Sequence, residues 1–213
     1  RKVVRVVTPG TLTDTELLDD RKETVLLSVY PAPRAQVGLA WTSLTQGRLQ
    51  LAECTLTDLA GWIVRIAPSE LLHPATVTAA FNEALQIARA ARRFALTLRP
   101  DFQFDAALGE RKLCAQLQAA SLAAWGADAM LNAQAAAAAL LAFAEHTQGR
   151  ALTHLTGLAV VRDGEFIDLP LTTRRNLELV QTLRGDDAPT LLSLLDTCET
   201  GMGSRLLRRW LLM

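Results

Sequence analysis

Residues 24–30, Thr24-Val25-Leu26-Leu27-Ser28-Val29-Tyr30, decide the fold that this sequence predicts. The run is almost continuously apolar, which is typical of a strand buried on both faces of a sheet. A second apolar run at 37–44 follows the Pro31/Pro33 turn, and residues 49–53 alternate after the loop Thr45-Gln46-Gly47-Arg48. Glycine in such a loop supplies the positive φ of a hairpin. We therefore expect a three-stranded antiparallel meander.

Helices and strands alternate beyond the meander. Thr55 and Asp58 have the spacing of a capping box, and apolar residues follow them at helical intervals as far as Pro68. The pattern then predicts a strand at 70–73, a helix at 77–91 and a fifth strand at 94–98. This order is typical of the α/β class, and it predicts a mixed five-stranded sheet with flanking helices in a ribonuclease-H-like arrangement.

Alanine dominates the segment that follows. Of residues 115–144, 15 of 30 are alanine, the residue with the highest helix propensity. Gly126 divides the segment, and Gly149 lies where a C-cap glycine is expected. Two helices that pack closely through small residues are predicted, together with a helix around 105–118.

The last third predicts a different kind of structure. Strands at 158–161 and 166–169 flank the turn Arg162-Asp163-Gly164-Glu165, whose Asp-Gly pair favours a hairpin. Thr172 or Thr173 would cap a helix over 174–183, and Thr190 would cap one over 191–195. A final helix starts near Met202. We expect this segment to be the beginning of a second, all-α domain.

The two ends of the chain predict an excised piece of a longer protein. An apolar, strand-like stretch at 1–7 lacks an initiator methionine and leads through the turn Thr8-Pro9-Gly10-Thr11 to a polar, helix-like stretch at 14–20. The apolar helix at the other end reaches residue 213 without a Gly or Pro stop signal. The exposed apolar tail is expected to be mobile or to pack on a neighbouring molecule. Its apolar residues are Trp210, Leu211 and Leu212.

The composition excludes several classes of function. The 213 residues include 22 Lys+Arg and 22 Asp+Glu, so the formal net charge is zero, and 50% of them are hydrophobic. A net charge of zero argues against a protein whose main function is to bind nucleic acid or an anionic membrane. No apolar run approaches the ~20 residues of a membrane helix. Cys54, Cys114 and Cys198 are too far apart for a disulfide framework or a zinc motif, which predicts a reduced, cytoplasmic setting.

The arginines of the last third are matched in number by acids. Eight arginines gather there: Arg150, Arg162, Arg174, Arg175, Arg184, Arg205, Arg208 and Arg209. Eight acids accompany them: Asp163, Glu165, Asp168, Glu178, Asp186, Asp187, Asp196 and Glu199. This balance predicts a solvated, salt-bridged surface in preference to a phosphate track.

A ribonuclease-H-like sheet raises the alternative of a metal-dependent nuclease, because such enzymes hold two metal ions on carboxylates of the central strands. The first predicted strand carries no acid. Asp20 and Glu23 precede that strand, and Glu70 stands at the head of the fourth. A divalent cation needs more than one carboxylate, so this pattern does not favour the nuclease.

The remaining motifs have structural interpretations. No G-x-x-x-x-G-K-[ST] loop, which would bind a triphosphate, is present. A superficially similar stretch is interpreted as a turn that begins a helix: Gly201-Met202-Gly203-Ser204-Arg205. His73 is predicted to be an edge residue that follows an apolar strand. His146 falls in the last turn of a helix, where it suits the helix dipole. His154 carries no signal, and Cys114 and Cys198 are predicted to be buried and inert.

Three segments resemble one known family, the MutS proteins of DNA mismatch repair. Residues 3–11 resemble the segment that leaves the mismatch-reading domain of these proteins. Residues 173–179 are similar to the start of their core (lever) domain, and residues 194–211 are similar to the core-domain signature that follows. The signature residues that carry this resemblance are Arg175, Asn176, Leu177, Asp196, Met202, Gly203 and Arg205.

The resemblance implies a division into three parts. Residues 1–11 would end the mismatch-binding domain, 12–150 would form the connector domain, and 151–213 would begin the core domain. In this family the full protein is a homodimer that binds mismatched duplex DNA and hydrolyses ATP with magnesium. Those sites would lie outside this chain, so no cofactor, metal or catalytic residue is expected within it. Phe102-Gln103-Phe104 does not reproduce the family's Phe-x-Glu mismatch motif.

The resemblance also implies a role and a partner. The connector would relay signals between the mismatch-binding and ATPase parts and offer a docking surface to the protein MutL, in the bacterial cytoplasm. The family's partner contacts lie near the helix predicted around 105–118. That helix reads Gly109-Glu110-Arg111-Lys112 in place of the family's polar pattern, so no contact residue is assigned. The alternatives are a divergent nuclease and a purely structural spacer.

Overall fold

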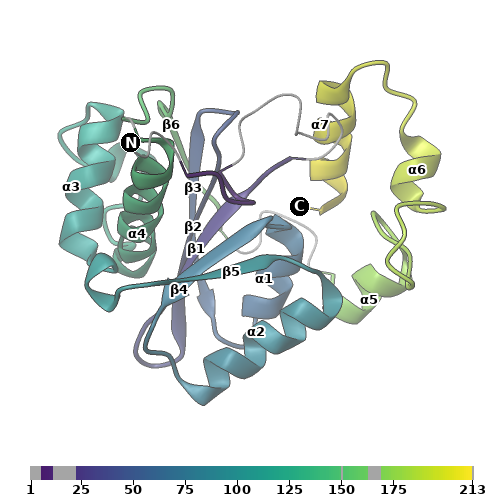
Figure 1. The fold of residues 1–213 in the computed structure, drawn as a ribbon, viewed down its shortest axis with the longest axis horizontal. Helices are drawn as coiled ribbons and strands as arrows, with labels where there is room; N and C mark the ends of the chain where they lie inside the picture. The colour runs from purple at the N-terminus through teal and green to yellow at the C-terminus, as the bar shows by residue number, and fades with distance from the viewer. Residues whose placement is uncertain (1–5, 12–22, 150, 163–168, 213) are drawn as a thin grey trace.

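A six-stranded mixed sheet forms the centre of the protein (Figure 1). The computed structural model describes residues 6–11, 23–149, 151–162 and 169–212. The strand order is β5-β4-β1-β2-β3-β6, in which β1–β2 and β2–β3 are antiparallel and the other neighbours are parallel. The strands are β1 (Leu26–Pro31), β2 (Gln36–Ser43), β3 (Arg48–Thr55), β4 (Glu70–Pro74), β5 (Ala95–Arg99) and β6 (Gly157–Val160).

The meander predicted from residues 24–53 is confirmed as β1, β2 and β3. The first four residues of β1 are buried, because helices cover both faces of the sheet. Leu27 belongs to the apolar cluster on one face, and Leu26 belongs to the cluster on the other. The continuously apolar sequence of β1 therefore follows from its place inside a three-layer structure.

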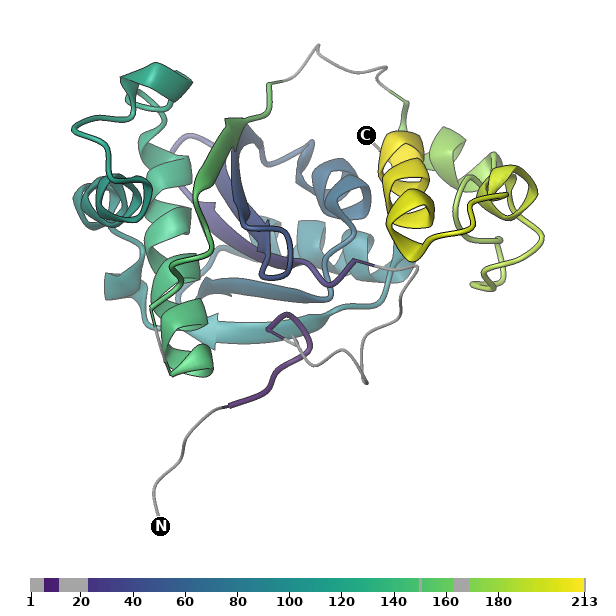
Figure 2. The same cartoon turned by 90° about the horizontal axis from the view of Figure 1, so that it is seen from above.

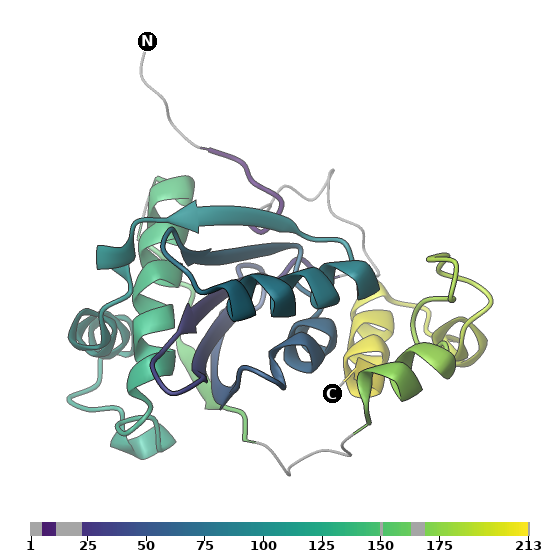
Figure 3. The same cartoon turned by 90° about the horizontal axis from the view of Figure 1, so that it is seen from below.

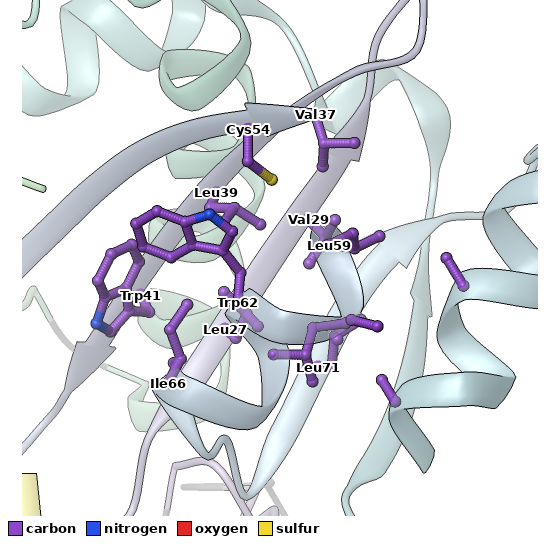
Figure 4. Close-up of a cluster of buried hydrophobic side chains, with 14 of the residues drawn as sticks. Leu27, Val29, Val37, Leu39, Trp41, Cys54, Leu59, Trp62, Ile66 and Leu71 are labelled. Atoms are coloured by element: carbon purple, nitrogen blue, oxygen red, sulfur yellow. The ribbon is translucent and has the colours of Figure 1, made fainter. Parts of the chain in front are cut away.

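Helices α1 (Leu59–Ile66) and α2 (Ala79–Ala91) cover one face of the sheet. The core beneath α1 is drawn in Figure 4, where Trp62 of α1 lies over Trp41 of β2. The two ring centroids are 6.2 Å apart and the rings are tilted by 59°. Aromatic pairs with this tilted geometry gain energy beyond the area that they bury.

Helices α3 (Ala106–Leu117) and α4 (Leu131–Gln148) cover the other face, as Figure 2 shows from above. Almost every residue of α4 is buried, since the helix lies between the sheet and α3. Small side chains permit this close approach. The ideal Cβ of an alanine at Gly38 would lie 2.0 Å from the carbonyl oxygen of Asn132, and one at Gly109 would lie 1.9 Å from that of Gln134.

The sheet has one strand more than expected. Residues 157–160 form β6, which pairs in parallel with Arg48–Leu51 at the edge of β3. The sequence pattern predicts a strand here, but as half of a hairpin with 166–169. Most of that partner and the Asp163-Gly164 turn lie outside the described residues. The short β6 instead extends the sheet that precedes it in sequence.

Several local predictions need correction. The capping box predicted from Thr55 and Asp58 does not form: α1 starts later, with Asp58 at its N-cap position but without a side-chain cap, and Thr55 Oγ1 donates a hydrogen bond of 2.5 Å to the Asp58 carboxylate. Gly126 follows a short 3₁₀ turn at 123–125, so the alanine-rich segment contains one long helix, α4, after the end of α3. Gly149 caps α4 with φ 64°, as predicted. The predictions at 1–5 and 14–20 lie outside the described residues.

Three helices follow the sheet domain. They are α5 (Leu171–Asn176), α6 (Leu191–Leu195) and α7 (Gly201–Leu212). Figure 3 shows two of them, α5 and α7, beside α1 and the end of α2, with α6 on the far side of α7. Helix α5 covers 171–176 in place of the predicted 174–183: Pro170 occupies its N-cap position, where the Pro170 carbonyl accepts a hydrogen bond from the Arg174 amide at 3.0 Å. Thr190 caps α6 as predicted. None of the helices in the described ranges is both long and apolar enough to cross a membrane.

Candidate functional site

A buried carboxylate holds the N-terminal segment against the sheet. Glu70, the first residue of β4, is only 1% exposed. Its Oε2 accepts hydrogen bonds from the Thr8 hydroxyl at 2.5 Å and the Gly10 amide at 2.9 Å, and its Oε1 accepts one from the Thr97 hydroxyl at 2.6 Å. We call these four residues the N-terminal clamp. Both carboxylate oxygens are thus engaged by protein donors, which is how a buried charge is stabilised.

The end of α4 completes the attachment of this segment. The Thr147 carbonyl accepts a hydrogen bond from the Val6 amide at 3.0 Å, and the side chain of Gln148 donates to the Thr11 carbonyl at 2.9 Å. Thr11 is fully buried. Glycine is required at position 10, because a Cβ there would lie 2.7 Å from the Cβ of Glu70. Residues 6–11 are therefore fixed to both the sheet and α4 (Figure 2).

His73 lies in an interior strand. It belongs to β4, which has β1 and β5 on its two sides, so the predicted edge position is wrong. The ring is buried against Phe81 with a centroid distance of 5.8 Å, and its Nδ1 lies 2.8 Å from the Pro74 carbonyl. Burial lowers the pKa of His73, and the contact with the carbonyl opposes this shift only in part. The histidine is a neutral core residue at pH 7.

A cleft lined by arginines separates α2 from the C-terminal helices. It has a volume of about 510 Å³, and Asp187 is the single acid among the described residues that line it. Its arginines come from the end of α2, from α5, from the turn after α5 and from α7. We call the cleft lined by these seven residues the arginine cleft: Arg89, Arg92, Arg93, Arg174, Arg175, Arg184 and Arg208. The count of charges in the last third misses this grouping, because three of the seven lie in α2 or immediately after it.

The cleft is built on hydrogen bonds that join α5 to α7. Arg174 is buried, and its guanidinium donates to the carbonyl oxygens of Leu169 at 3.3 Å and Leu212 at 2.5 Å. Leu212 also lines the cleft. Burial lowers the pKa of Arg92 to about 10, helped by the charge of Arg208 and opposed by that of Asp187. Arg92 is therefore still positively charged at pH 7.

A second, smaller cavity of about 60 Å³ adjoins the arginine cleft and contains Glu23. Burial raises the pKa of Glu23 above its ordinary 4.5, and this effect outweighs the opposing influence of Arg209, of a hydrogen bond with Ser43 and of Arg205. Glu23 thus places a carboxyl group among the arginines of α7. Asp20, the other acid named ahead of β1, lies outside the described residues.

The signature residues occupy the helices around the cleft. Arg175, Asn176 and Leu177 end α5 and are exposed, whereas Arg205 lines the smaller cavity. Asp196 Oδ1 accepts hydrogen bonds from the Ser204 hydroxyl at 2.9 Å and the Cys198 amide at 3.2 Å.

The Ser204 bond ties the first turn of α7 to the end of α6, and the Cys198 bond holds the connection between the two helices. Gly203 packs closely there, since a Cβ would lie 3.1 Å from that of Cys198. Met202, beside it in α7, is exposed.

The other candidate residues are dispersed. His146 lies in the last turn of α4, as predicted, and His154 is exposed. Cys54 is buried, but Cys114 and Cys198 are only half-buried, contrary to prediction, and no disulfide joins any of the three. In the ranges 6–11, 23–149, 151–162 and 169–212, no three His, Cys, Asp or Glu side chains lie close enough to hold a metal ion.

The fold and these contacts define the class of this protein. It is an α/β domain in which the buried carboxylate of Glu70 binds the N-terminal segment, residues 6–11, of the same chain. Comparison with family models is more specific. The model described as MutS domain II matches residues 24–156, and the model described as MutS domain III matches residues 172–213. The chain therefore belongs to the MutS family of DNA mismatch-repair proteins. The matched domains are non-catalytic parts of a MutS protein.

Proposed function

We propose that this chain relays conformational changes between the mismatch-binding and ATPase parts of a MutS protein and offers a docking surface to MutL. The N-terminal clamp is the observation that carries the relay. Because Glu70 and the end of α4 hold residues 6–11, a displacement of this segment moves the whole sheet with it. The C-terminal helices are attached to the same body through α1. Rigid-body movement of a domain is an established way to couple distant sites, with typical energies of about 1–3 kcal/mol.

The relay is tested in a MutS protein that carries this segment. Glu70→Ala removes the acceptor of three hydrogen bonds, and Thr97→Val removes one of them while keeping the shape of the side chain. We expect both variants to bind mismatched DNA and ATP, but to show a smaller change of ATPase rate when the mismatch binds. Thr97→Val keeps the test usable if Glu70→Ala does not fold. Glu83→Ala, which changes an exposed side chain, is the control. Unchanged coupling in folded Glu70→Ala would contradict the relay.

MutL docking is tested separately by capture of purified MutL on the immobilised 213-residue chain. A docking domain retains MutL, whereas a structural spacer retains none. The contact residues are sought among exposed positions of α3, because the resemblance directs attention to that helix. Glu110→Lys and Arg111→Glu reverse exposed charges there, and Glu83→Lys on the opposite face of the sheet is the matched control.

A further inference from the structure

The arginine cleft has the size and the charge of a site for a small anion. Its volume of about 510 Å³ lies in the range of small-molecule pockets, roughly 300–1,000 Å³. Seven arginines and one acid line it, although the protein as a whole has no net charge. This concentration of positive charge is therefore a property of how the chain folds.

The like charges of the cleft are costly without a counter-ion. Guanidinium groups repel one another, and the repulsion grows where water is partly excluded. The Nε atom of Arg92 is buried and has no hydrogen-bond partner among the described residues, and Arg208 adds a second positive charge beside it. The dipole of α2 favours basic residues at its C-terminal end, which accounts for Arg89, Arg92 and Arg93. A helix dipole likewise favours Arg174 and Arg175 in the last turn of α5, but it does not account for Arg184 in the turn after α5 or for Arg208 in α7.

We propose that the arginine cleft binds a compact oligophosphate, a chain of two or three phosphate groups that is either free or carried by a nucleoside. Arginine donates pairs of hydrogen bonds to phosphate oxygens, and several arginines around one cavity match an anion with several phosphates. Duplex DNA fits less well, because the arginines converge on one cleft and do not follow an extended track. The proposal does not rest on the relay function.

The position of the cleft gives the ligand a structural consequence. One wall comes from α2, inside the MutS domain II match, and the other comes from α5, α7 and the turn at 181–185, inside the domain III match. An anion that contacts both walls would hold the two segments together. Binding to the folded state alone raises the thermal midpoint of unfolding.

Isothermal titration of the 213-residue chain with inorganic triphosphate at low ionic strength tests the proposal. We expect saturable binding of one triphosphate per chain and a higher thermal midpoint. In the double variant Arg93→Gln/Arg184→Gln the affinity should fall by roughly tenfold or more, since each change removes a charged donor from a different wall. Both side chains are exposed, so the variant is expected to fold.

The matched control is Arg34→Gln/Arg111→Gln, which removes the same number of exposed charges away from the cleft. It should leave the affinity within about twofold. Parallel titrations with ATP distinguish the two sources: equal affinities identify the phosphate chain as the recognised group, and tighter binding of ATP shows that the nucleoside is also held. Three results would overturn the proposal: no saturation at millimolar triphosphate, equal losses in both double variants, or binding of duplex DNA alone.

Discussion

Glu70 shows how one side chain can hold two parts of the chain together. Replacing it with glutamine keeps the shape but puts an NH2 group, which cannot accept a hydrogen bond, in place of one of the two carboxylate oxygens. Because hydrogen bonds to a charged, buried acceptor are lost, we expect Glu70→Gln to lower the free energy of unfolding by about 2 kcal/mol. Urea unfolding of the 213-residue chain measures this loss. The exposed Glu83→Gln should stay within about 0.5 kcal/mol of the parent, and an equal loss there would contradict the clamp.

Glu23 predicts a dependence of stability on pH. Its pKa is raised in the folded state, so the folded chain holds the carboxyl proton more tightly than the unfolded chain does. The contribution of Glu23 to stability is full below pH 4.5 and declines as the pH rises through the folded-state pKa. Glu23→Gln removes this decline. Relative to the parent, the variant should therefore gain stability between pH 4.5 and pH 7, as measured by urea unfolding at several pH values.

The converse result is informative too. If Glu23→Gln has the same stability difference from the parent at pH 4.5 and at pH 7, the carboxyl group is not desolvated as described. Glu83→Gln again serves as the control, since this side chain is exposed on α2.

Two glycines allow a matched test of how α3 and α4 pack. Gly109 lies in α3 where a Cβ would meet the backbone of α4, whereas Gly61 lies in α1 with open space around its Cβ position. Alanine has the better helix propensity at both sites, by about 1 kcal/mol. We expect Gly61→Ala to stabilise the chain by up to about 1 kcal/mol. Gly109→Ala should destabilise it by about 2 kcal/mol or more, because backbone atoms of α4 must move.

Thermal and urea unfolding of the two variants measure the difference, and the yield of folded protein serves if Gly109→Ala does not fold. Similar, stabilising effects at both positions would show that the α3–α4 contact is looser than described.

Local sequence signals predicted individual elements well. Thr190 caps α6 and Gly149 ends α4 as expected, because a cap depends on neighbours within a few residues. The predicted bounds of α5 are wrong at both ends, since Thr172 and Thr173 suggested a cap whereas Pro170 holds the N-cap position and the helix ends at Asn176. Long-range contacts left no local signal: the Glu53 carboxylate accepts the amides of Asn132 and Ala133 at the start of α4, at 2.8 and 3.1 Å.

The candidate sites were harder to predict than the elements. Glu70 stands out in the sequence as an acid at the head of an apolar strand, but only the fold reveals that its partners are Thr8, Gly10 and Thr97. The arginine cleft combines residues that are about 80 to 120 positions apart in the chain. Neither a charge count nor a local motif detects such a grouping, because it is created by the packing of α5 and α7 beside α2.

At the scale of the whole molecule, α7 leaves an apolar stripe exposed. Met202, Leu206 and Trp210 follow one another at intervals of four along α7 and are 73%, 44% and 70% exposed. Leu211 and Leu212, which were expected to be exposed as well, are half-buried. We expect the 213-residue chain to self-associate as its concentration rises, through burial of this apolar stripe.

Sedimentation equilibrium measures the effect. Leu206→Gln/Trp210→Gln should lower the weight-average mass at high concentration toward that of the monomer. Phe102→Gln, which removes a side chain outside α7 that is 78% exposed, should not. A monomeric parent at all concentrations would contradict this prediction.

The parallel strand β6 has a practical meaning for anyone who shortens the gene. A polypeptide that stops at residue 150 lacks β6, so those backbone groups of Arg48–Leu51 that point away from β2 would face solvent along a bare border of the sheet. Such borders recruit strands from other molecules. We expect this shortened polypeptide to turn cloudy and bind thioflavin T within hours at a concentration where one that ends at residue 162 stays clear. If both solutions stay equally clear, β3 does not need β6 beside it to prevent aggregation.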